Sequence, residues 1–124
     1  MSAHTIAQAL LRRETAGEFL QQRTPEWYTA RQKILTASEI SSVLDSNIYK
    51  SSYELMIQKL TPVTELNNAA VAWGVKFEPI ASKFYEFLKK EKVYDLGLVI
   101  HSKHAWLGAS PDGLLLSDKL LEIK

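Results

Sequence analysis

The stretch Ser-Pro-Asp-Gly-Leu-Leu-Leu-Ser-Asp-Lys-Leu-Leu-Glu-Ile-Lys, residues 110–124, predicts a β-hairpin that carries charged side chains. Apolar runs lie on both sides of Ser117-Asp118-Lys119, an order typical of two strands joined by a tight turn. Side chains two residues apart in a strand project from the same face, so Glu122 and Lys124 are expected to point the same way. The hairpin therefore decides where these charged residues gather.

A three-residue loop over 117–119 fixes the expected register of this hairpin. It predicts the facing pairs Leu116 with Leu120, Leu114 with Glu122, and Asp112 with Lys124. Asp112 and Glu122 are then diagonal neighbours on one face, with backbones about 7–8 Å apart, and their carboxylates can converge on one divalent cation. A two-residue turn would shift the register by one residue and divide the cluster between the two faces.

Two carboxylates and a lysine suit the hydrolysis of a phosphodiester bond. Carboxylate oxygens bind Mg²⁺, which keeps several waters and accepts a phosphate oxygen. The bound metal lowers the pKa of a water, and a nearby lysine can position that water or stabilise the developing charge. The combination of an aspartate, a turn and a Glu-x-Lys string also arises often by chance. Exposed charges on an ordinary hairpin are the more frequent explanation of this pattern taken alone.

Helices are expected before this strand-rich end of the chain. They are a helix over 5–22, one from Pro25 capped by Thr24, one opened by a capping box of Thr36 and Glu39, one from Ser51 or Ser52 through Leu60, and a long one from Asn67 or Asn68 to about Lys90. Two of them have an apolar stripe that predicts core packing: Tyr53, Met56, Ile57 and Leu60, and Trp73, Phe77, Ile80, Phe84 and Phe87 or Leu88. Short strands are expected over 98–101, 106–110, 112–116 and 120–124. Helices followed by strands predict an α+β fold.

The composition is that of one globular domain: 124 residues, 46% hydrophobic and 23% charged. The absence of cysteine excludes disulfide scaffolds, thiolate zinc sites and cysteine nucleophiles. No apolar run reaches the roughly 20 residues of a membrane helix, and no signal-peptide pattern opens the chain. An intracellular protein without a membrane partner is therefore expected. The net charge of +1 does not exclude DNA binding, because a local patch matters more than the sum.

Five short strings occur in order along the chain. They are Pro25-Glu26-Trp27-x-x-x-Arg31, Leu35-Thr36-Ala37-Ser38-Glu39-Ile40, Trp73-Gly74-x-x-x-Glu78-Pro79, Gly108-Ala109-Ser110-Pro111-Asp112-Gly113 and Leu121-Glu122-Ile123-Lys124. Together they resemble the lambda-phage exonuclease and YqaJ-type viral recombinase family, part of the PD-(D/E)xK nuclease superfamily. The resemblance implies a restriction-endonuclease-like core over residues 23–124, with residues 1–22 as a helix outside it. It also implies C-terminal truncation, because the family continues past Glu-x-Lys into a helix and a further strand.

The resemblance implies a role for each matching residue. Asp112, Glu122 and the backbone carbonyl of Ile123 are the implied metal ligands, and Glu78 is the implied acidic residue that faces the metal directly or through water. Lys124 is the implied catalytic lysine, which completes a catalytic set with the three carboxylates. The positions that hold the 5′-phosphate of a DNA end are matched by Arg31, Ser38 and Ser110.

Several of these residues also have an ordinary structural explanation. Arg31 lies one helical turn from Trp27 and can simply stack on it. Ser38 can simply cap a helix, and Glu78 can be a first-turn carboxylate beside a proline kink. The five ordered strings favour the catalytic explanation for the three carboxylates and Lys124, and leave the phosphate-binding positions balanced between the two.

The resemblance implies a Mg²⁺-dependent exonuclease, with Mn²⁺ as an alternative cofactor, that digests one strand of linear double-stranded DNA from its 5′ end. Recombination, repair or replication would be its setting. A single-strand annealing protein is the implied partner, and a homo-oligomer is implied because some relatives form trimeric rings. A second hypothesis is a truncated, catalytically inactive remnant of the nuclease fold that binds DNA ends or another protein. A third, a helical interaction module, requires the order of the strings to be coincidence.

Overall fold

The computed structural model describes residues 4–61 and 69–123 and has the expected α+β composition. The chain divides into two compact units. Residues 20–64 and 98–110 form the first, here called the mixed-sheet unit, and residues 1–19, 65–97 and 111–124 form the second, here called the hairpin unit. Among the described residues, no helix has both the length and the apolar character needed to cross a membrane.

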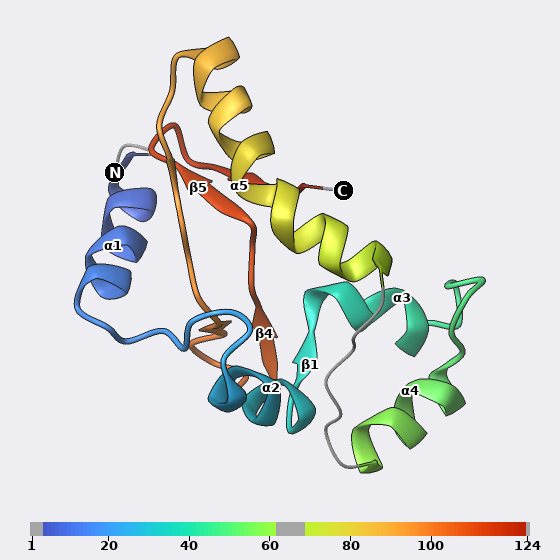
Figure 1. Ribbon diagram of the computed structural model, residues 1–124. Coiled ribbons are helices and arrows are strands. Elements are labelled where there is room, and N and C mark those ends of the chain that lie inside the picture. Colours follow the sequence, from blue (N-terminus) through green and yellow to red (C-terminus); the bar gives the residue numbers. More distant parts are fainter. Residues whose placement is uncertain (1–3, 62–68, 124) are drawn as a thin grey trace. The chain divides into compact units, whose positions relative to one another are not determined.

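The mixed-sheet unit is built on a three-stranded sheet in the order β1-β4-β3. Its strands and helices are β1 (Leu35–Thr36), β3 (Val99–Ile100), β4 (Leu107–Ala109), α2 (Pro25–Gln32), the 3₁₀ helix η1 (Ala37–Glu39), α3 (Ile40–Val43) and α4 (Ser52–Leu60) (Figure 1). Strand β4 runs antiparallel to β3 and parallel to β1. The parallel pair joins segments far apart in the sequence, and its strand β1 was not expected from the local pattern.

Gly108 allows the strands of this sheet to approach closely. It pairs with Thr36 of β1, whose side chain is buried. A Cβ at position 108 would lie 2.8 Å from Cδ1 of Ile34 and 3.1 Å from the carbonyl oxygen of Val99. The missing side chain is therefore part of what joins β4 to its neighbours.

Two of the predicted helix caps are confirmed in this unit. The Thr24 hydroxyl accepts a hydrogen bond from the backbone N–H of Trp27, with Pro25 at the first position of α2. The Ser51 hydroxyl accepts a hydrogen bond from the backbone N–H of Glu54 at the start of α4. The capping box at Thr36 is wrong: its side chain makes no cap hydrogen bond, because Oγ1 lies 3.1 Å from the hydroxyl of Ser38 instead.

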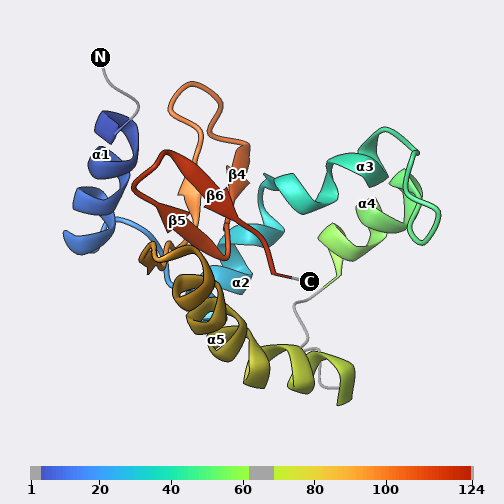
Figure 2. The same cartoon turned by 90° about the horizontal axis from the view of Figure 1, so that it is seen from above.

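The hairpin unit contains the second three-stranded sheet, antiparallel throughout and in the order β2-β5-β6. Its elements are α1 (His4–Thr15), α5 (Ala69–Lys89), β2 (Val93–Tyr94), β5 (Gly113–Leu115) and β6 (Lys119–Leu121). Figure 2 shows β5 and β6 as the two arms of the hairpin. Leu114 and Leu115 of β5 are almost completely buried, so the central strand anchors the core of this unit.

The register of the hairpin differs from the predicted one by two residues. Leu114 lies opposite Leu120 rather than Glu122, and Leu115 lies opposite Lys119. The loop still has three residues, but they are 116–118, with Asp118 in the left-handed region at φ 67°. Such loops place a left-handed residue last, and Asp adopts this conformation more readily than Lys. A shift of two residues keeps every side chain on its predicted face.

Helix α1 ends earlier than predicted. Gly17 has φ 78°, and its N–H donates to the carbonyl of Glu14, while the N–H of Glu18 donates to the carbonyl of Arg13. These two bonds form a Schellman motif, which stops a helix at a left-handed glycine. The predicted extension to residue 22 is therefore wrong, and Gly17 is the residue that ends the helix.

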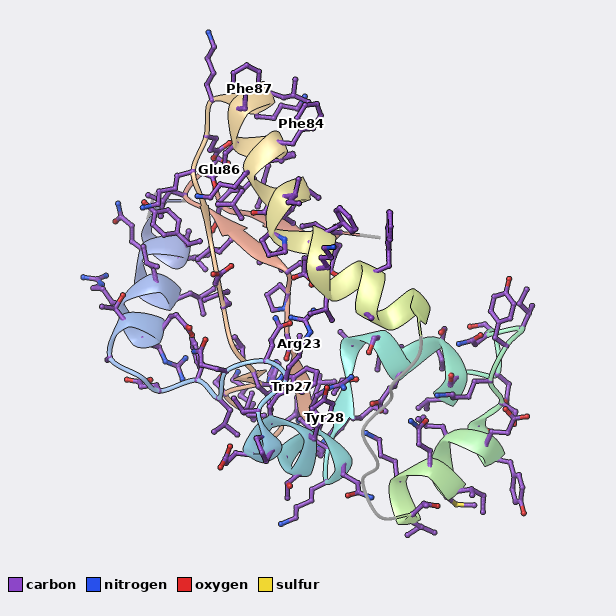
Figure 3. All side chains as sticks on the ribbon, viewed as in Figure 1. Arg23, Trp27, Tyr28, Phe84, Glu86 and Phe87 are labelled. Atoms are coloured by element: carbon purple, nitrogen blue, oxygen red, sulfur yellow. The ribbon has the colours of Figure 1, made fainter. Side chains whose placement is uncertain are left out.

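The apolar stripes predicted as core on α4 and α5 are largely exposed. Tyr53, Met56, Ile57 and Leu60 all face solvent, and Leu55 is the buried residue of α4. On α5, Trp73, Phe84 and Phe87 are 67%, 61% and 78% exposed, and Figure 3 shows the last two projecting from the C-terminal part of the helix. Pro79 lies inside α5 without ending it. The predicted start at Asn67 or Asn68 lies outside the described residues.

Candidate active site

Arg31 and Trp27 form one stacked pair on α2, in the mixed-sheet unit. They are separated by one helical turn, so both side chains lie on the same side of the helix. The guanidinium carbon of Arg31 lies 4.3 Å from the centroid of the Trp27 ring, a cation–π contact. The stacking that the sequence suggested is confirmed. It orients the planar donor group that suits bidentate contact with a phosphate.

Trp27 also reaches a residue far away in the sequence. Its indole Nε1–H donates a 2.9 Å hydrogen bond to the hydroxyl of Ser110, which directly follows β4. Trp27 is buried on α2 and is labelled in Figure 3. One indole thus contacts two of the three predicted phosphate-binding residues, Arg31 through its face and Ser110 through its edge. The sequence reasoning assigned Trp27 no such role.

The third predicted phosphate-binding residue, Ser38, lies in η1 of the same unit. Its side chain is exposed, and its hydroxyl lies 3.1 Å from the hydroxyl of the buried Thr36. Either hydroxyl can be the donor in this pair. Ser38 is therefore held by a buried neighbour and does not cap a helix.

An ion-pair network adjoins Arg31 and was missed by the sequence reasoning. Glu39 of η1 lies 4.0 Å from the Arg31 guanidinium and 2.8 Å from the ammonium of Lys59, which comes from α4. The Lys59 ammonium also donates to the backbone carbonyl of Arg31 at 2.6 Å. Because no local sequence pattern pairs α4 with η1, only the folded structure reveals this contact.

Asp112 is fixed in the hairpin unit by a main-chain contact. The backbone N–H of Ile123 donates a 2.8 Å hydrogen bond to Oδ2 of Asp112, and both residues are partly buried. The last paired residues of the β5–β6 ladder are Gly113 and Leu121, so Asp112 and Ile123 lie just beyond it.

The remaining predicted ligands are placed as follows. Glu78 lies half-buried in α5, and Glu122 is exposed just beyond β6. Lys124 lies outside the described residues. Across residues 4–61 and 69–123, no three His, Cys, Asp or Glu side chains gather into a group that could hold a metal ion. The structure therefore brings Asp112 to Ile123, just after β6, without assembling a complete three-side-chain set within its described part.

Residues 26–124 match the YqaJ-like viral recombinase domain. The chain is 36% identical over 118 residues to a protein of Acanthamoeba polyphaga mimivirus, an alignment that covers 84% of this chain and 21% of that protein. The sequence match therefore spans most of this chain and only a small part of its longer relative.

Solved structures give a similar result. The fold is similar to the crystal structure of an alkaline exonuclease, LHK-Exo from Laribacter hongkongensis, with a TM-score of 0.65 and 40% identity over 82% of this chain and 53% of that one. The structure of LHK-Exo in complex with dAMP matches with a TM-score of 0.60 and 39% identity, over 74% of this chain and 48% of that one. The chain thus spans about half the length of this solved relative.

Proposed function

The chain belongs to the YqaJ-like viral recombinase family, and on that premise we propose that it supplies a large part of the active site of a metal-dependent DNA exonuclease. The single observation that supports this most strongly is the 2.8 Å contact between Asp112 and the main chain of Ile123. It holds the aspartate of Ser-Pro-Asp-Gly against the middle residue of Glu-x-Lys. In a restriction-endonuclease-like core, these are the two segments that hold the metal.

The proposed metal ligands are hard oxygen donors, the class that Mg²⁺ or Mn²⁺ binds in proteins. They are the carboxylates of Asp112 and Glu122 and the carbonyl of Ile123, with Glu78 reached directly or through water. The hydrogen bond from Ile123 leaves the second oxygen of Asp112 for a ligand. The Ile123 carbonyl is proposed from the family resemblance, and its residue already contacts Asp112 through its N–H. When bound, the metal would activate a water and neutralise charge on the scissile phosphate.

Lys124 would act on the water or on the developing charge. In a strand it shares a face with Glu122, so its ammonium would lie on the side of the metal ligands. From that side an ammonium can orient the attacking water or stabilise the negative charge of the transition state. The neutral amine form of the same side chain can accept a proton from the water. This assignment is made from the sequence and the family.

The mixed-sheet unit would bind the terminal 5′-phosphate. Arg31 offers a guanidinium fork, and the hydroxyls of Ser38 and Ser110 offer further donors. Trp27 contacts both Arg31 and Ser110, which supports treating them as one group. A solved relative is known in complex with dAMP, a nucleoside monophosphate of the kind that an exonuclease releases.

The remaining parts of the proposal concern the whole protein. Residues 23–124 would be the N-terminal portion of the nuclease domain, and residues 1–22 would lie outside the family match. Linear double-stranded DNA would be the substrate, digested from 5′ to 3′ in recombination, repair or replication. A single-strand annealing protein and a ring of identical subunits would be its partners.

An inactive remnant that binds DNA ends or another protein is the second candidate. It is favoured by the lack of a three-side-chain metal group within the described residues. Digestion assays on the full-length protein separate the two, using linear duplexes with either a 5′-phosphate or a 5′-hydroxyl. The exonuclease proposal expects nucleotide release that requires Mg²⁺, stops with chelator and prefers the phosphorylated end. End binding without release under all metal conditions would support the remnant.

A further inference from the structure

Lys59 is held by three oxygen atoms of its own unit. Its ammonium donates to the Arg31 carbonyl at 2.6 Å and to Oε1 of Glu39 at 2.8 Å. The other carboxylate oxygen, Oε2, also lies 2.8 Å from the ammonium, and it is buried with no hydrogen-bond partner. The Lys59 side chain is only 22% exposed. One ammonium therefore ties α4 to both α2 and η1.

These contacts make Lys59 unsuited to direct phosphate binding. An ammonium has three N–H donors and no other polar group. Two donors are used by the Arg31 carbonyl and by Oε1 of Glu39, and the carboxylate lies against the third side through Oε2. The charge of Lys59 therefore acts within the protein rather than on a ligand.

Glu39 is an unfavourable neighbour for a phosphate site unless its charge is balanced. Its carboxylate is 16% exposed and lies 4.0 Å from the Arg31 guanidinium. That distance is too long for a hydrogen bond, so the guanidinium donors remain uncommitted to Glu39. A negative carboxylate this close would repel a phosphate and attract Arg31, and both effects are strong where water is largely excluded.

We propose that Lys59 is a positioning residue for the 5′-phosphate site, which neutralises Glu39 and so keeps the Arg31 guanidinium available to a phosphorylated DNA end. This inference rests on the proposed function of Arg31 and adds to it the two residues that set its charge balance. Without Lys59, Glu39 would draw the guanidinium into a direct ion pair. Arg31 would then lose phosphate affinity without being changed itself.

The charge-balance role predicts a rescue that a purely structural role does not. Lys59→Met removes the charge and keeps most of the apolar stem, and it should lower the preference for a 5′-phosphate over a 5′-hydroxyl by about tenfold or more, as unbalancing a partly buried charge pair does. Adding Glu39→Gln removes the unbalanced carboxylate, and the double variant should regain most of the preference. Replacing both members of such a pair is also the change that the fold tolerates best.

The experiment measures Kd values of the full-length protein for two duplexes that differ only in the 5′-phosphate, in chelator so that no cleavage occurs. Lys50→Met is the matched control, because Lys50 is a partly exposed lysine whose ammonium contacts Gln58 rather than the Arg31 network. It removes one positive charge from the same unit and should leave the phosphate preference unchanged. Circular dichroism confirms that each variant is folded.

The outcomes separate this inference from the proposed function. Loss in Lys59→Met with recovery in the double variant supports the inference. A normal preference in Lys59→Met, or a double variant as impaired as the single one, overturns it and leaves the phosphate site standing. A wild-type protein that binds both duplexes equally well shows that the proposed phosphate site itself is wrong, and the inference falls with it.

Discussion

Ile123 donates its backbone N–H to the Oδ2 atom of Asp112 across 2.8 Å, and this bond joins the segment that follows β6 to the residue before β5. The last pair of the β5–β6 ladder is Gly113 with Leu121; Asp112 is one residue before Gly113, and Ile123 is two residues after Leu121. The bond continues the hairpin through a side chain where the main-chain ladder stops. Asp112 is thereby both a structural acceptor and a proposed metal ligand, and these two roles can be separated by mutation.

The first prediction concerns the structural role of Asp112. Asp112→Ala leaves the partly buried N–H of Ile123 without its acceptor and should lower the free energy of unfolding by about 1–2 kcal/mol. Asp112→Asn keeps an amide oxygen that can accept the same bond, so its loss should be clearly smaller. Urea unfolding of the full-length protein measures both changes. Equal stability of the alanine variant and the wild type would show that this bond does not stabilise the hairpin.

The second prediction concerns close packing around β5. A Cβ on Gly113 would overlap with Cγ1 of Val93, and a β-branched side chain has little freedom to move aside. Gly113→Ala should therefore destabilise the protein by about 1–3 kcal/mol.

Gly74→Ala is the matched control for this substitution. Gly74 lies inside α5, and a Cβ there meets nothing within 4 Å. Alanine at this position should stabilise the helix by about 0.5–1 kcal/mol, because glycine has the higher conformational freedom when unfolded. Thermal and urea unfolding should thus move in opposite directions for the two variants. A shift in the same direction for both would contradict the packing around β5.

The third prediction separates the two contacts of Trp27. Trp27→Phe keeps an aromatic face for Arg31 but removes the N–H that bonds Ser110. Since one hydrogen bond contributes about 0.5–1.5 kcal/mol, the preference for a 5′-phosphorylated end should fall by about two- to tenfold. Trp27→Leu removes both contacts and should lower it further. A phenylalanine variant with full preference, measured by duplex binding, would show that the bond to Ser110 does not orient the phosphate site.

The fourth prediction is a pH dependence at the start of α4. Asp45 has φ 54° and accepts a 2.9 Å hydrogen bond from the backbone N–H of Ser52. That bond, with a second from the Ser52 side chain, holds the pKa of Asp45 below its usual value near 3.8. A carboxyl group whose pKa is lowered by folding stabilises the folded protein at every pH above the pKa that the group has in the unfolded chain. This stabilisation is lost as the pH falls through the pKa of Asp45 in the folded protein.

Asp45→Asn tests this prediction, because asparagine adopts a positive φ readily and can still accept the bond. Wild-type stability should fall more steeply than that of the variant between about pH 5 and about pH 2, and the two curves should converge at the acid end. Unfolding free energies across this range measure the difference. Parallel curves would show that the charge on Asp45 contributes nothing to stability.

The hairpin shows how much of the fold the sequence could predict. Its two strands and its loop length were predictable from alternation and turn residues. The register was wrong because the loop was centred on Asp118, whereas Asp118 is its last residue. The tolerance of Asp for the left-handed conformation was the signal that could have corrected it.

Contacts between distant segments were not predictable from local patterns. The parallel pairing of β1 with β4, the bond from Trp27 to Ser110 and the network around Lys59 all join residues far apart in the sequence. Family resemblance grouped Arg31 with Ser110 but assigned nothing to Trp27 or Lys59. Long-range pairings depend on the whole fold, and no short window encodes them.

The apolar stripes of α4 and α5 illustrate a further limit. Helical periodicity correctly identified two helices, but Leu55, the buried residue of α4, lies outside the predicted apolar stripe. Periodicity does not determine what packs against a stripe, and in this structure Phe84, Phe87 and Leu60 are exposed. Burial is a property of the assembled fold, so a stripe predicts an apolar face and not a core.

Nucleotide release from linear 5′-phosphorylated duplex DNA, by full-length wild type and by Asp112→Asn, tests the central claim most directly. The wild type should release nucleotides in Mg²⁺ and none in chelator. Asp112→Asn, folded as judged by circular dichroism, should be slower by at least about 100-fold, since even the loss of an outer-shell partner costs up to that factor. Release by Asp112→Asn at the wild-type rate would contradict the assignment of Asp112 as the metal-binding aspartate of a nuclease.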